Sequence, residues 1–379
     1  HCSIDEGHEI TNAQESQGSV RKIPKLTRRD SDMNRPSGKP TIYDVAEQVG
    51  ASPSTVSAVL NGSWTRRRIS ETTVENIRKA AAELGYATNL QARGLRQARS
   101  GLVGMIIPIH DNRFFSSLSQ NFDTLARERG LCPVIASTRR NPSEERRIVE
   151  TFISYAVDAI FIAGSTDPAQ LGELCASAKL KHIFVDLPGL NAPSVLTDNF
   201  SGAQLLTHRI LDAMPPADAG RRPYFLGGSV SDYATARRLA AFRQAVADSG
   251  GVVLDEQIIQ CGYAPRDAAS AITSLCQRIG GLPAGLFVNS FTAFEGVMSH
   301  FVTLPPSAFA NTAIGCFDYD PFATFLQFPV YMIRQDAHGL IAKAYELLDH
   351  GETAAIMHEV RPELIEPRTI ARQDLGMLG

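Results

Sequence analysis

The sequence contains no apolar run near the roughly 18 residues that are needed to span a bilayer. It also lacks a basic, apolar leader ending in small residues, so secretion is not indicated. Its six cysteines are scattered, with no CxxC pair and no neighbouring Cys/His cluster. That distribution favours buried thiols in a reducing compartment over disulfides or zinc. We therefore expect a cytoplasmic protein without a metal site.

No catalytic motif is present either. The nine histidines are dispersed, and neither a GxSxG elbow nor a phosphate-binding GxxxxGK[ST] loop occurs. Gly227-Gly228 follows an apolar run and is interpreted as a turn. Isolated acids at the ends of predicted strands have no neighbouring nucleophile or cofactor motif, which favours ligand binding over catalysis. The prediction is a protein that is not an enzyme and has no cofactor.

Charge is distributed unevenly along the 379 residues, although the total is only −3. Residues 21–100 carry 15 Lys and Arg against 7 Asp and Glu, whereas residues 1–20 have four acids and no base. Residues 101–379 are acidic. A basic segment next to an acidic body indicates a polyanionic partner for the basic segment alone.

The stretch TIYDVAEQVGASPSTVSAVLNG, residues 41–62, predicts a helix, a tight turn and a second helix. Apolar residues recur at helical spacing from Ile42, and Gly50 is placed to end the first helix in a left-handed conformation. Ser52 and Pro53 match the N-cap and first position of the second helix. A helical hairpin is the plain alternative, but the pattern is typical of a DNA-binding helix-turn-helix.

Two basic features follow. SWTRRRIS places Arg66, Arg67 and Arg68 in one loop, interpreted either as phosphate-contacting or as a solvated charge run. Ser70 then begins a third predicted helix that Gly85 ends. In ATNLQARGLRQARS, Leu95 lies among arginines, which suits insertion into a DNA minor groove or a plain linker. Residues 1–40 are polar and aperiodic, and we expect them to be disordered.

From Gly101 onward, short apolar runs alternate with amphipathic stretches. This pattern predicts an α/β body of parallel sheets covered on both faces, with about 280 residues favouring two lobes. Ligands of such sheets bind beyond the carboxyl ends of the strands. Polar residues gather there and predict a cleft for a small polyhydroxy ligand: His110, Asp111, Asn112, Arg139, Arg140, Asp186, Asp198, Asn289 and Asp318.

The helix-turn-helix stretch and ISETTVENIRKAAAELGYATNLQARGLR resemble the head and hinge of the LacI/GalR transcriptional repressors, and IRQD fits near the end of the body. TRRRIS, ARGLR, PYFLGGSVSDYATARRLAAF and LFVNSFTAFEGVM most resemble the fructose and sucrose repressors. The resemblance implies a helix-turn-helix head joined to a periplasmic-binding-protein-like body of two doubly wound lobes. It also implies a homodimer or homotetramer on a near-palindromic operator.

The resulting domain prediction is a tail at 1–40, a head at 41–87, a hinge at 88–100 and a body at 101–370. Within the body we expect lobe N at about 101–197 and 334–355, and lobe C at about 198–333 and 356–370. The resemblance and the basic loop together give the predicted DNA-binding residues: Thr41, Tyr43, Ser52, Pro53, Ser54, Ser57, Ala58, Asn61, Arg66, Arg67, Arg68, Tyr86, Asn89, Ala92 and Leu95.

The resemblance further implies that Arg238 grips sugar hydroxyls in the body cleft. The expected effector is sucrose, fructose or fructose 1-phosphate, releasing a repressor of a carbohydrate operon. Leu187 stands where fructose repressors often have arginine, which weakens the prediction of a phosphorylated effector. Arg139 and Arg140 are an alternative source of that charge, although a solvated pair is favoured. The alternatives are a dual repressor and activator or a sugar-transport protein. The complete set of predicted effector-binding residues is Asp111, Asp186, Arg238, Asn289, Asp318 and Gln335.

Overall fold

The computed structural model describes residues 40–86, 99–215 and 222–367, and the chain divides into two compact units, His1–Thr88 and Asn89–Gly379. The first unit contains helices α1 (Ile42–Val49), α2 (Pro53–Leu60) and α3 (Glu71–Glu83). Each begins and ends where the sequence predicts. Gly50 is left-handed (φ 64°), and the Ser52 and Ser70 hydroxyls accept the N–H groups of Thr55 and Thr73. The three helices enclose a small apolar core around Val45, Val56 and Ile77.

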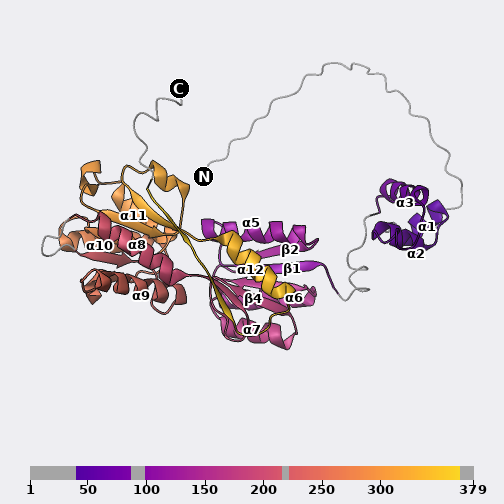
Figure 1. Cartoon of the computed structure of the whole chain (residues 1–379), viewed down its shortest axis with the longest axis horizontal. Coiled ribbons are helices and arrows are strands. Elements are labelled where there is room, and N and C mark those ends of the chain that lie inside the picture. Colours follow the sequence, from indigo (N-terminus) through magenta and orange to yellow (C-terminus); the bar gives the residue numbers. More distant parts are fainter. Residues whose placement is uncertain (1–39, 87–98, 216–221, 368–379) are drawn as a thin grey trace, which may run out of the picture. The chain divides into compact units, whose positions relative to one another are not determined.

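The second unit has two lobes, each built on a six-stranded sheet (Figure 1). The first lobe begins with β1 (Leu102–Ile107), α5 (Arg113–Glu128), β2 (Cys132–Ser137) and α6 (Pro142–Ser154), followed by β3 (Ala159–Ala163), α7 (Pro168–Ser177), β4 (Lys181–Val185) and β5 (Ser194–Thr197). Near the C-terminus the chain returns to this lobe with α12 (Ala337–Asp349) and β11 (Met357–Val360). The strand order is β11-β5-β4-β3-β1-β2, and all pairings are parallel.

The second lobe begins with α8 (Asn199–Ala213), β6 (Pro223–Leu226), α9 (Tyr233–Asp248), η1 (Asp255–Gln257), β7 (Ile258–Ile259) and α10 (Pro265–Ile279). It continues with β8 (Gly285–Val288), α11 (Phe291–Phe301), η2 (Pro306–Phe309), β9 (Ala313–Phe317), η3 (Pro321–Phe325), β10 (Val330–Arg334) and β12 (Glu363–Ile365). The strand order is β12-β10-β9-β8-β6-β7, parallel except where β12 runs antiparallel to β10.

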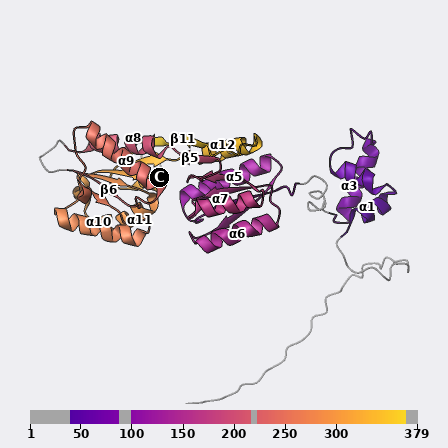
Figure 2. The ribbon, with the colours of Figure 1, turned by 90° about the horizontal axis from the view of Figure 1, so that it is seen from below.

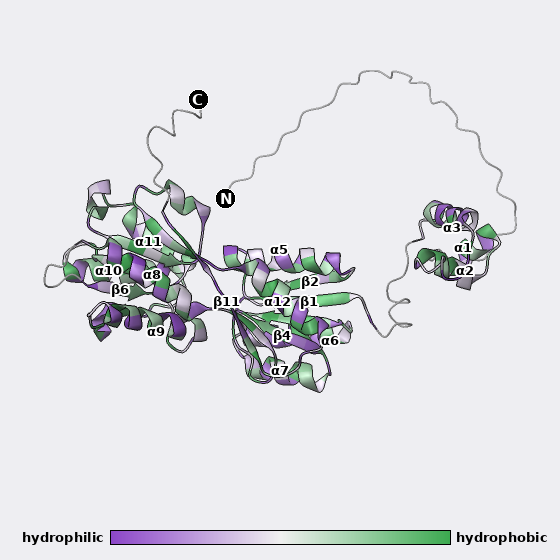
Figure 3. Ribbon diagram, viewed as in Figure 1, coloured by the Kyte–Doolittle hydropathy of each residue, from purple (hydrophilic) through white to green (hydrophobic). Residues whose placement is uncertain are grey.

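Helices cover both faces of each sheet, as the alternating sequence pattern predicts. In the first lobe α5 and α12 contribute to one apolar cluster, and α6 and α7 to another. In the second lobe α8 and α9 lie opposite α10 and α11 (Figure 2). Strand β1 is hydrophobic along most of its length, whereas helices such as α5 and α9 carry both hydrophobic and polar residues (Figure 3). Among the described residues, no helix is long and apolar enough to cross a membrane.

The lobe boundaries need one correction. Residues 356–370 were all expected in lobe C, but Met357–Val360 pairs with β5 as the edge strand of the first sheet. The chain changes lobe only after Val360, and Glu363–Ile365 then joins the second sheet beside β10. Three segments therefore cross between the lobes, after β5, after β10 and after β11. A hydrophobic run alone does not reveal which of two sheets it joins.

Gly296 in α11 tests the packing that positions one wall of the cleft. A Cβ at this position would lie 2.0 Å from the Pro265 carbonyl oxygen, a backbone atom of α10 that cannot move aside. We expect Gly296→Ala to lower the free energy of unfolding of the body by about 1–3 kcal/mol. Urea unfolding followed by circular dichroism measures this change.

Gly172→Ala in α7 is the matched control, because its new Cβ would meet nothing closer than the Phe184 ring at 3.7 Å. Removing a helix glycine there should raise the free energy of unfolding by up to about 1 kcal/mol. If the two variants unfolded at the same urea concentration, the close contact between α10 and α11 would be wrong.

Candidate DNA-binding head and effector cleft

In the head, most predicted DNA-binding residues are accessible. Thr41, Ser52, Ser54 and Asn61 are exposed, and the Tyr43 side chain is 70% exposed. Tyr86 is half-buried against the head core. The hinge positions Asn89, Ala92 and Leu95 lie outside the described residues.

Ala58 was predicted to bind DNA, but the structure does not support this prediction. It is only 4% exposed, and its carbonyl oxygen accepts both the N–H and the hydroxyl of Ser63 at 2.9 and 3.3 Å. These bonds close the C-terminal turn of α2, and the buried Ala58 side chain is not accessible to DNA, in contrast to what the sequence predicts. Pro53 and Ser57 remain partly exposed on the same helix.

In the body, a cleft of about 870 Å³ opens between the lobes at the carboxyl ends of the strands. Asp111, Asp186, Arg238, Asp318 and Gln335 all line it, although they lie up to 224 positions apart in the sequence. Its volume is in the range of sites for small molecules. The parallel topology brings these residues together, as predicted for the carboxyl edges of the two sheets.

Arg238 is the most constrained side chain of the cleft. It projects from α9, is 4% exposed, and donates through Nε to Asn199 Oδ1 at 2.8 Å and through Nη1 to the Asn289 carbonyl at 2.6 Å. Its guanidinium carbon lies 3.7 Å from the centroid of the Phe317 ring. Three elements of the second lobe thus hold one cation in a fixed orientation.

Asn289 does not line the cleft, which corrects another prediction. Its side chain is fully buried behind Arg238, and Nδ2 donates to Thr235 Oγ1 at 3.0 Å. Among the described residues, nothing donates a hydrogen bond to its buried Oδ1 atom. Asn289 therefore positions Arg238 through its main-chain carbonyl instead of touching a ligand in the cleft.

Asp318 and Gln335 form a chain of hydrogen bonds at the lobe crossover. Gln335 Nε2 donates to Asp318 Oδ1 at 2.6 Å, and Thr197 Oγ1 donates to Gln335 Oε1 at 2.6 Å. The Phe291 N–H reaches the second Asp318 oxygen at 3.1 Å. Thr197 and Gln335 lie in two of the segments that cross between the lobes. These hydrogen bonds therefore connect Asp318 in the cleft lining to the crossing segments.

Sequence reasoning did not select two further cleft residues, Asp232 and Tyr263. The Tyr263 and Thr235 hydroxyls both donate to the Asp232 carboxylate, which also caps α9. Burial raises the pKa of the Tyr263 hydroxyl. Asp232 directly precedes α9, and its residue type is favoured at helix N-caps, which is a signal that could have identified it. Tyr263 follows β7, whose two residues are too few for a strand pattern.

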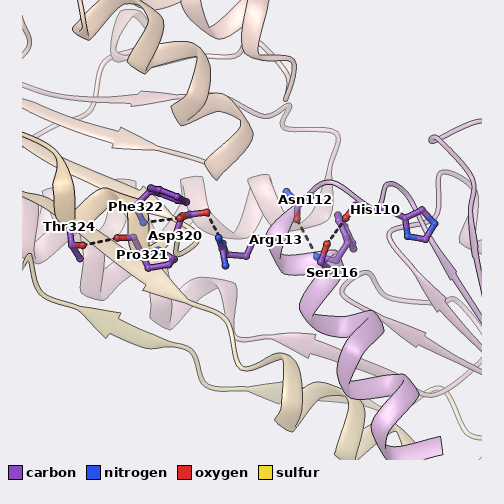
Figure 4. Close-up of polar contacts among 9 residues, drawn as sticks. His110, Asn112, Arg113, Ser116, Asp320, Pro321, Phe322 and Thr324 are labelled. Atoms are coloured by element: carbon purple, nitrogen blue, oxygen red, sulfur yellow. Dashed lines mark hydrogen bonds and ion pairs between the residues drawn. The ribbon is translucent and has the colours of Figure 1, made fainter.

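Two contacts join the lobes at the rim of the cleft. Arg113 Nε of α5 donates to Asp320 Oδ2 at 2.6 Å, and Asp320 also caps η3 by accepting the Phe322 N–H (Figure 4). The guanidinium carbon of Arg140 lies 5.5 Å from the Tyr263 ring centroid. Both contacts are made by side chains of opposite lobes, so they can form only while the lobes are near this arrangement.

The backbone is strained at several cleft residues. Arg139, Arg140, Asp186 and Asp318 have positive φ angles of 53°, 55°, 74° and 138°. Non-glycine residues in this region cost free energy and tend to cluster at binding sites. Among the described residues, no group of three His, Cys, Asp or Glu side chains is arranged to hold a metal ion.

Comparison with known proteins places both units. The model "Bacterial regulatory proteins, lacI family" matches residues 41–89, and "Periplasmic binding protein domain" matches residues 103–301. The sucrose operon repressor of Klebsiella pneumoniae is 31% identical over 314 residues, covering 81% of this chain and 91% of the relative. The chain belongs to the lacI family of bacterial regulatory proteins.

Other proteins similar to this LacI-family regulator are also bacterial repressors. The ribitol operon repressor of Klebsiella aerogenes is 43% identical over 218 residues, covering 56% of this chain and 79% of the relative. The lac repressor dimer bound to operator and an anti-inducer has a TM-score of 0.72 at 19% identity, covering 87% of this chain and 98% of that one. The fold resemblance is therefore confirmed, and the chain is a DNA-binding transcriptional regulator and not an enzyme.

Asp186 gives this regulator a testable pH dependence. Burial raises the pKa of its carboxyl to about 7, with smaller contributions from nearby charges, and none of the described residues donates a hydrogen bond to that carboxyl. Burial also raises the pKa of Asp318. A free aspartate has a pKa of about 3.9, so the folded body binds a proton more tightly than the unfolded chain. The free energy of unfolding should therefore fall as pH rises from about 4 to 7.

We expect Asp186→Asn to flatten this pH dependence, leaving the contribution of Asp318. Urea unfolding of the body at pH 5 and pH 8 compares the two proteins. The exposed Asp255→Asn variant should keep the unmodified difference between the two pH values. Equal pH dependence in Asp186→Asn and the unmodified chain would contradict the raised pKa.

Proposed function

We propose that this LacI-family regulator represses a carbohydrate-utilisation operon in the cytoplasm. An uncharged sugar or polyol of about the size of ribitol, fructose or sucrose binds the cleft and releases the operator. The observation that carries the effector class is the charge of the cleft lining. Its carboxylates outnumber its guanidinium groups: Asp111, Asp186, Asp232, Glu295 and Asp318 against Arg139, Arg140 and Arg238.

This lining suits hydroxyl groups. The Asp186 carboxylate and Arg238 guanidinium face the cleft, and a polyol hydroxyl can donate to the first while accepting from the second. A phosphorylated sugar would bring negative charge to a lining whose buried carboxyl groups already resist ionisation, since burial raises the pKa of Asp186 to about 7 and also raises that of Asp318. Relatives regulate ribitol and sucrose operons by name, which supports the polyol and ketose classes over other small molecules.

Release follows from unequal binding to two lobe arrangements. A ligand that contacts Asp186 in the first lobe and Arg238 in the second favours arrangements that bring these residues together. The operator-bound protein favours a different arrangement, so the effector shifts the population away from it. We propose that Thr41, Tyr43, Pro53, Ser54, Ser57 and Asn61 of the head face the operator groove.

A phosphorylated effector is the alternative. It is suggested by a structure with a related fold, the transcriptional dual regulator Cra of Pseudomonas putida in complex with fructose 1-phosphate. That structure has a TM-score of 0.63 at 21% identity, covering 71% of this chain and 99% of that one. Calorimetry with ribitol, fructose, sucrose and fructose 1-phosphate separates the two. Tighter binding of fructose 1-phosphate than of fructose would refute the uncharged effector.

A conservative substitution of Arg238 tests its role in binding the effector. Arg238→Lys keeps a charge but loses the planar fork that Asn199 and Asn289 hold, so effector affinity should fall roughly 10- to 100-fold. Operator binding without effector should persist. Arg243→Lys, also on α9 but at the surface, is the matched control and should respond like the unmodified chain.

Titration of an operator complex with the effector, followed by fluorescence anisotropy, measures both properties. If Arg238→Lys releases the operator at the same effector concentration as the control, Arg238 does not bind the effector.

The exposed aromatic residues of η3 allow the assembly of the chain to be tested. We propose a homodimer that uses η3, where the Phe322 and Phe325 rings are 70% and 71% exposed with centroids 6.3 Å apart. An exposed aromatic pair is typical of an interface centre. Replacing both by serine should weaken dimerisation at least about tenfold, as seen by light scattering across a concentration series.

Val252→Ser is the control, because Val252 is equally apolar and 75% exposed on the same lobe. It should leave the mass unchanged. A double variant that remains dimeric at the lowest concentration measured would place the interface elsewhere.

A further inference from the structure

The described part of the head has no net positive charge, which is unexpected for a DNA-binding unit. Residues 40–86 contain five basic and five acidic side chains. Helix α2, which has the position of a recognition helix, carries no charged residue. The phosphate backbone supplies much of the affinity of protein–DNA complexes through Lys and Arg. The basic residues are Arg66, Arg67, Arg68, Arg78 and Lys79.

Three of these five cations lie in one loop between α2 and α3, residues 63–69, which we name the arginine loop. It is a folded turn and not an open linker. Its backbone closes on itself through hydrogen bonds from Arg67 N to Ser63 O at 3.3 Å and from Ile69 N to Trp64 O at 3.1 Å. Arg68 adopts a left-handed conformation with φ 54°, which turns the chain back toward α3.

Both ends of the arginine loop are fixed to the head. The Ser63 N–H and hydroxyl donate to the Ala58 carbonyl of α2, and Trp64 and Ile69 pack against the head core. Trp64 is the only tryptophan of the chain. The loop is thereby held against the C-terminal end of α2, and its arginines are placed beside whatever surface α2 contacts.

The three arginine side chains are exposed, and none pairs with a carboxylate among the described residues. Many body arginines behave differently: Arg113, Arg127, Arg146, Arg209 and Arg334, for example, each contact an Asp or Glu. An arginine without a carboxylate partner can bind a phosphate without first breaking an ion pair. The fork geometry of its guanidinium group suits two phosphate oxygens.

We propose that the arginine loop is the phosphate-binding element of the head. Its guanidinium groups neutralise backbone phosphates beside the groove that α2 enters, while the uncharged α2 approaches the bases closely. This rests on the operator binding proposed above and assigns its electrostatic part to residues 66–68. The Trp64 anchor fixes where along the duplex these charges fall.

The test measures dissociation constants of the full-length chain by fluorescence anisotropy at KCl concentrations from about 50 to about 300 mM. In this range the affinity of phosphate contacts depends strongly on salt. The probes are a duplex selected from random sequence by the unmodified chain and a scrambled duplex of equal length. Arg66→Gln, Arg67→Gln, Arg68→Gln and their triple combination are compared. Arg78→Gln on exposed α3 is the control for removal of one head charge.

In the proposed homodimer each substitution removes the same arginine from both heads. Each arginine that binds a phosphate should therefore, when replaced by glutamine, reduce the slope of log affinity against log salt by about 1.8. The triple variant should show between two and three such steps, on both duplexes, and Arg78→Gln none. Trp64→Ala should reproduce part of this decrease with all arginines present, whereas Trp64→Phe should not. Thermal melting followed by circular dichroism verifies that the head of each variant is folded.

An unchanged salt slope in the folded triple variant would overturn the role of the loop while leaving operator binding intact. A decrease confined to the selected duplex would also overturn it, because the arginines would then read bases. Failure of the unmodified chain to prefer the selected duplex over the scrambled one would instead refute the operator binding on which the proposal rests.

Discussion

The body is organised around one buried cation. Removing the Arg238 guanidinium from water is costly unless hydrogen bonds and opposite charges compensate it. Asn199, the Asn289 carbonyl and the Phe317 ring satisfy its geometry. Its charge in turn lowers the cost of burying the nearby acids, whose pKa values burial nevertheless raises. A cleft built around this cation is therefore rich in carboxyl groups, which supports the uncharged effector proposed above.

The two lobes are joined by contacts that are individually weak. The Arg113–Asp320 ion pair is half-exposed on the arginine side, and such pairs contribute at most about 1 kcal/mol. The Arg140–Tyr263 contact is comparable, because cation–π contacts at exposed sites contribute about 0.5–1 kcal/mol. Three crossing segments keep the lobes adjacent without fixing their angle. A ligand with a few hydrogen bonds to both lobes adds to these weak contacts and stabilises the arrangement that brings the lobes together, which is the condition for an effector to shift the population.

Sequence patterns predicted the parallel sheets of the body because buried parallel strands are continuous apolar runs, and the caps of α1, α2 and α3 because their signals are local. They did not predict α7, whose amphipathic pattern is weak, or α12. They also placed β11 in the wrong lobe. Ala58 and Asn289 occupy the expected elements, yet neighbouring side chains cover them. Position along an element follows from periodicity, whereas burial of an individual side chain depends on tertiary packing.

Burial of Ala58 and the internal bonding of α2 bear on how the head recognises DNA. The Ser52 hydroxyl is engaged with Ser54 and Thr55, and the Asn61 amide donates to the Ser57 hydroxyl. A helix of small residues whose polar groups already bond one another can approach the bases closely but has few free donors for them. We infer that sequence selectivity rests more on the shape and deformability of the operator than on base contacts, and that rigidly placed charges help to hold the deformed duplex. A folded loop anchored by Trp64 provides such placement better than a flexible basic tail.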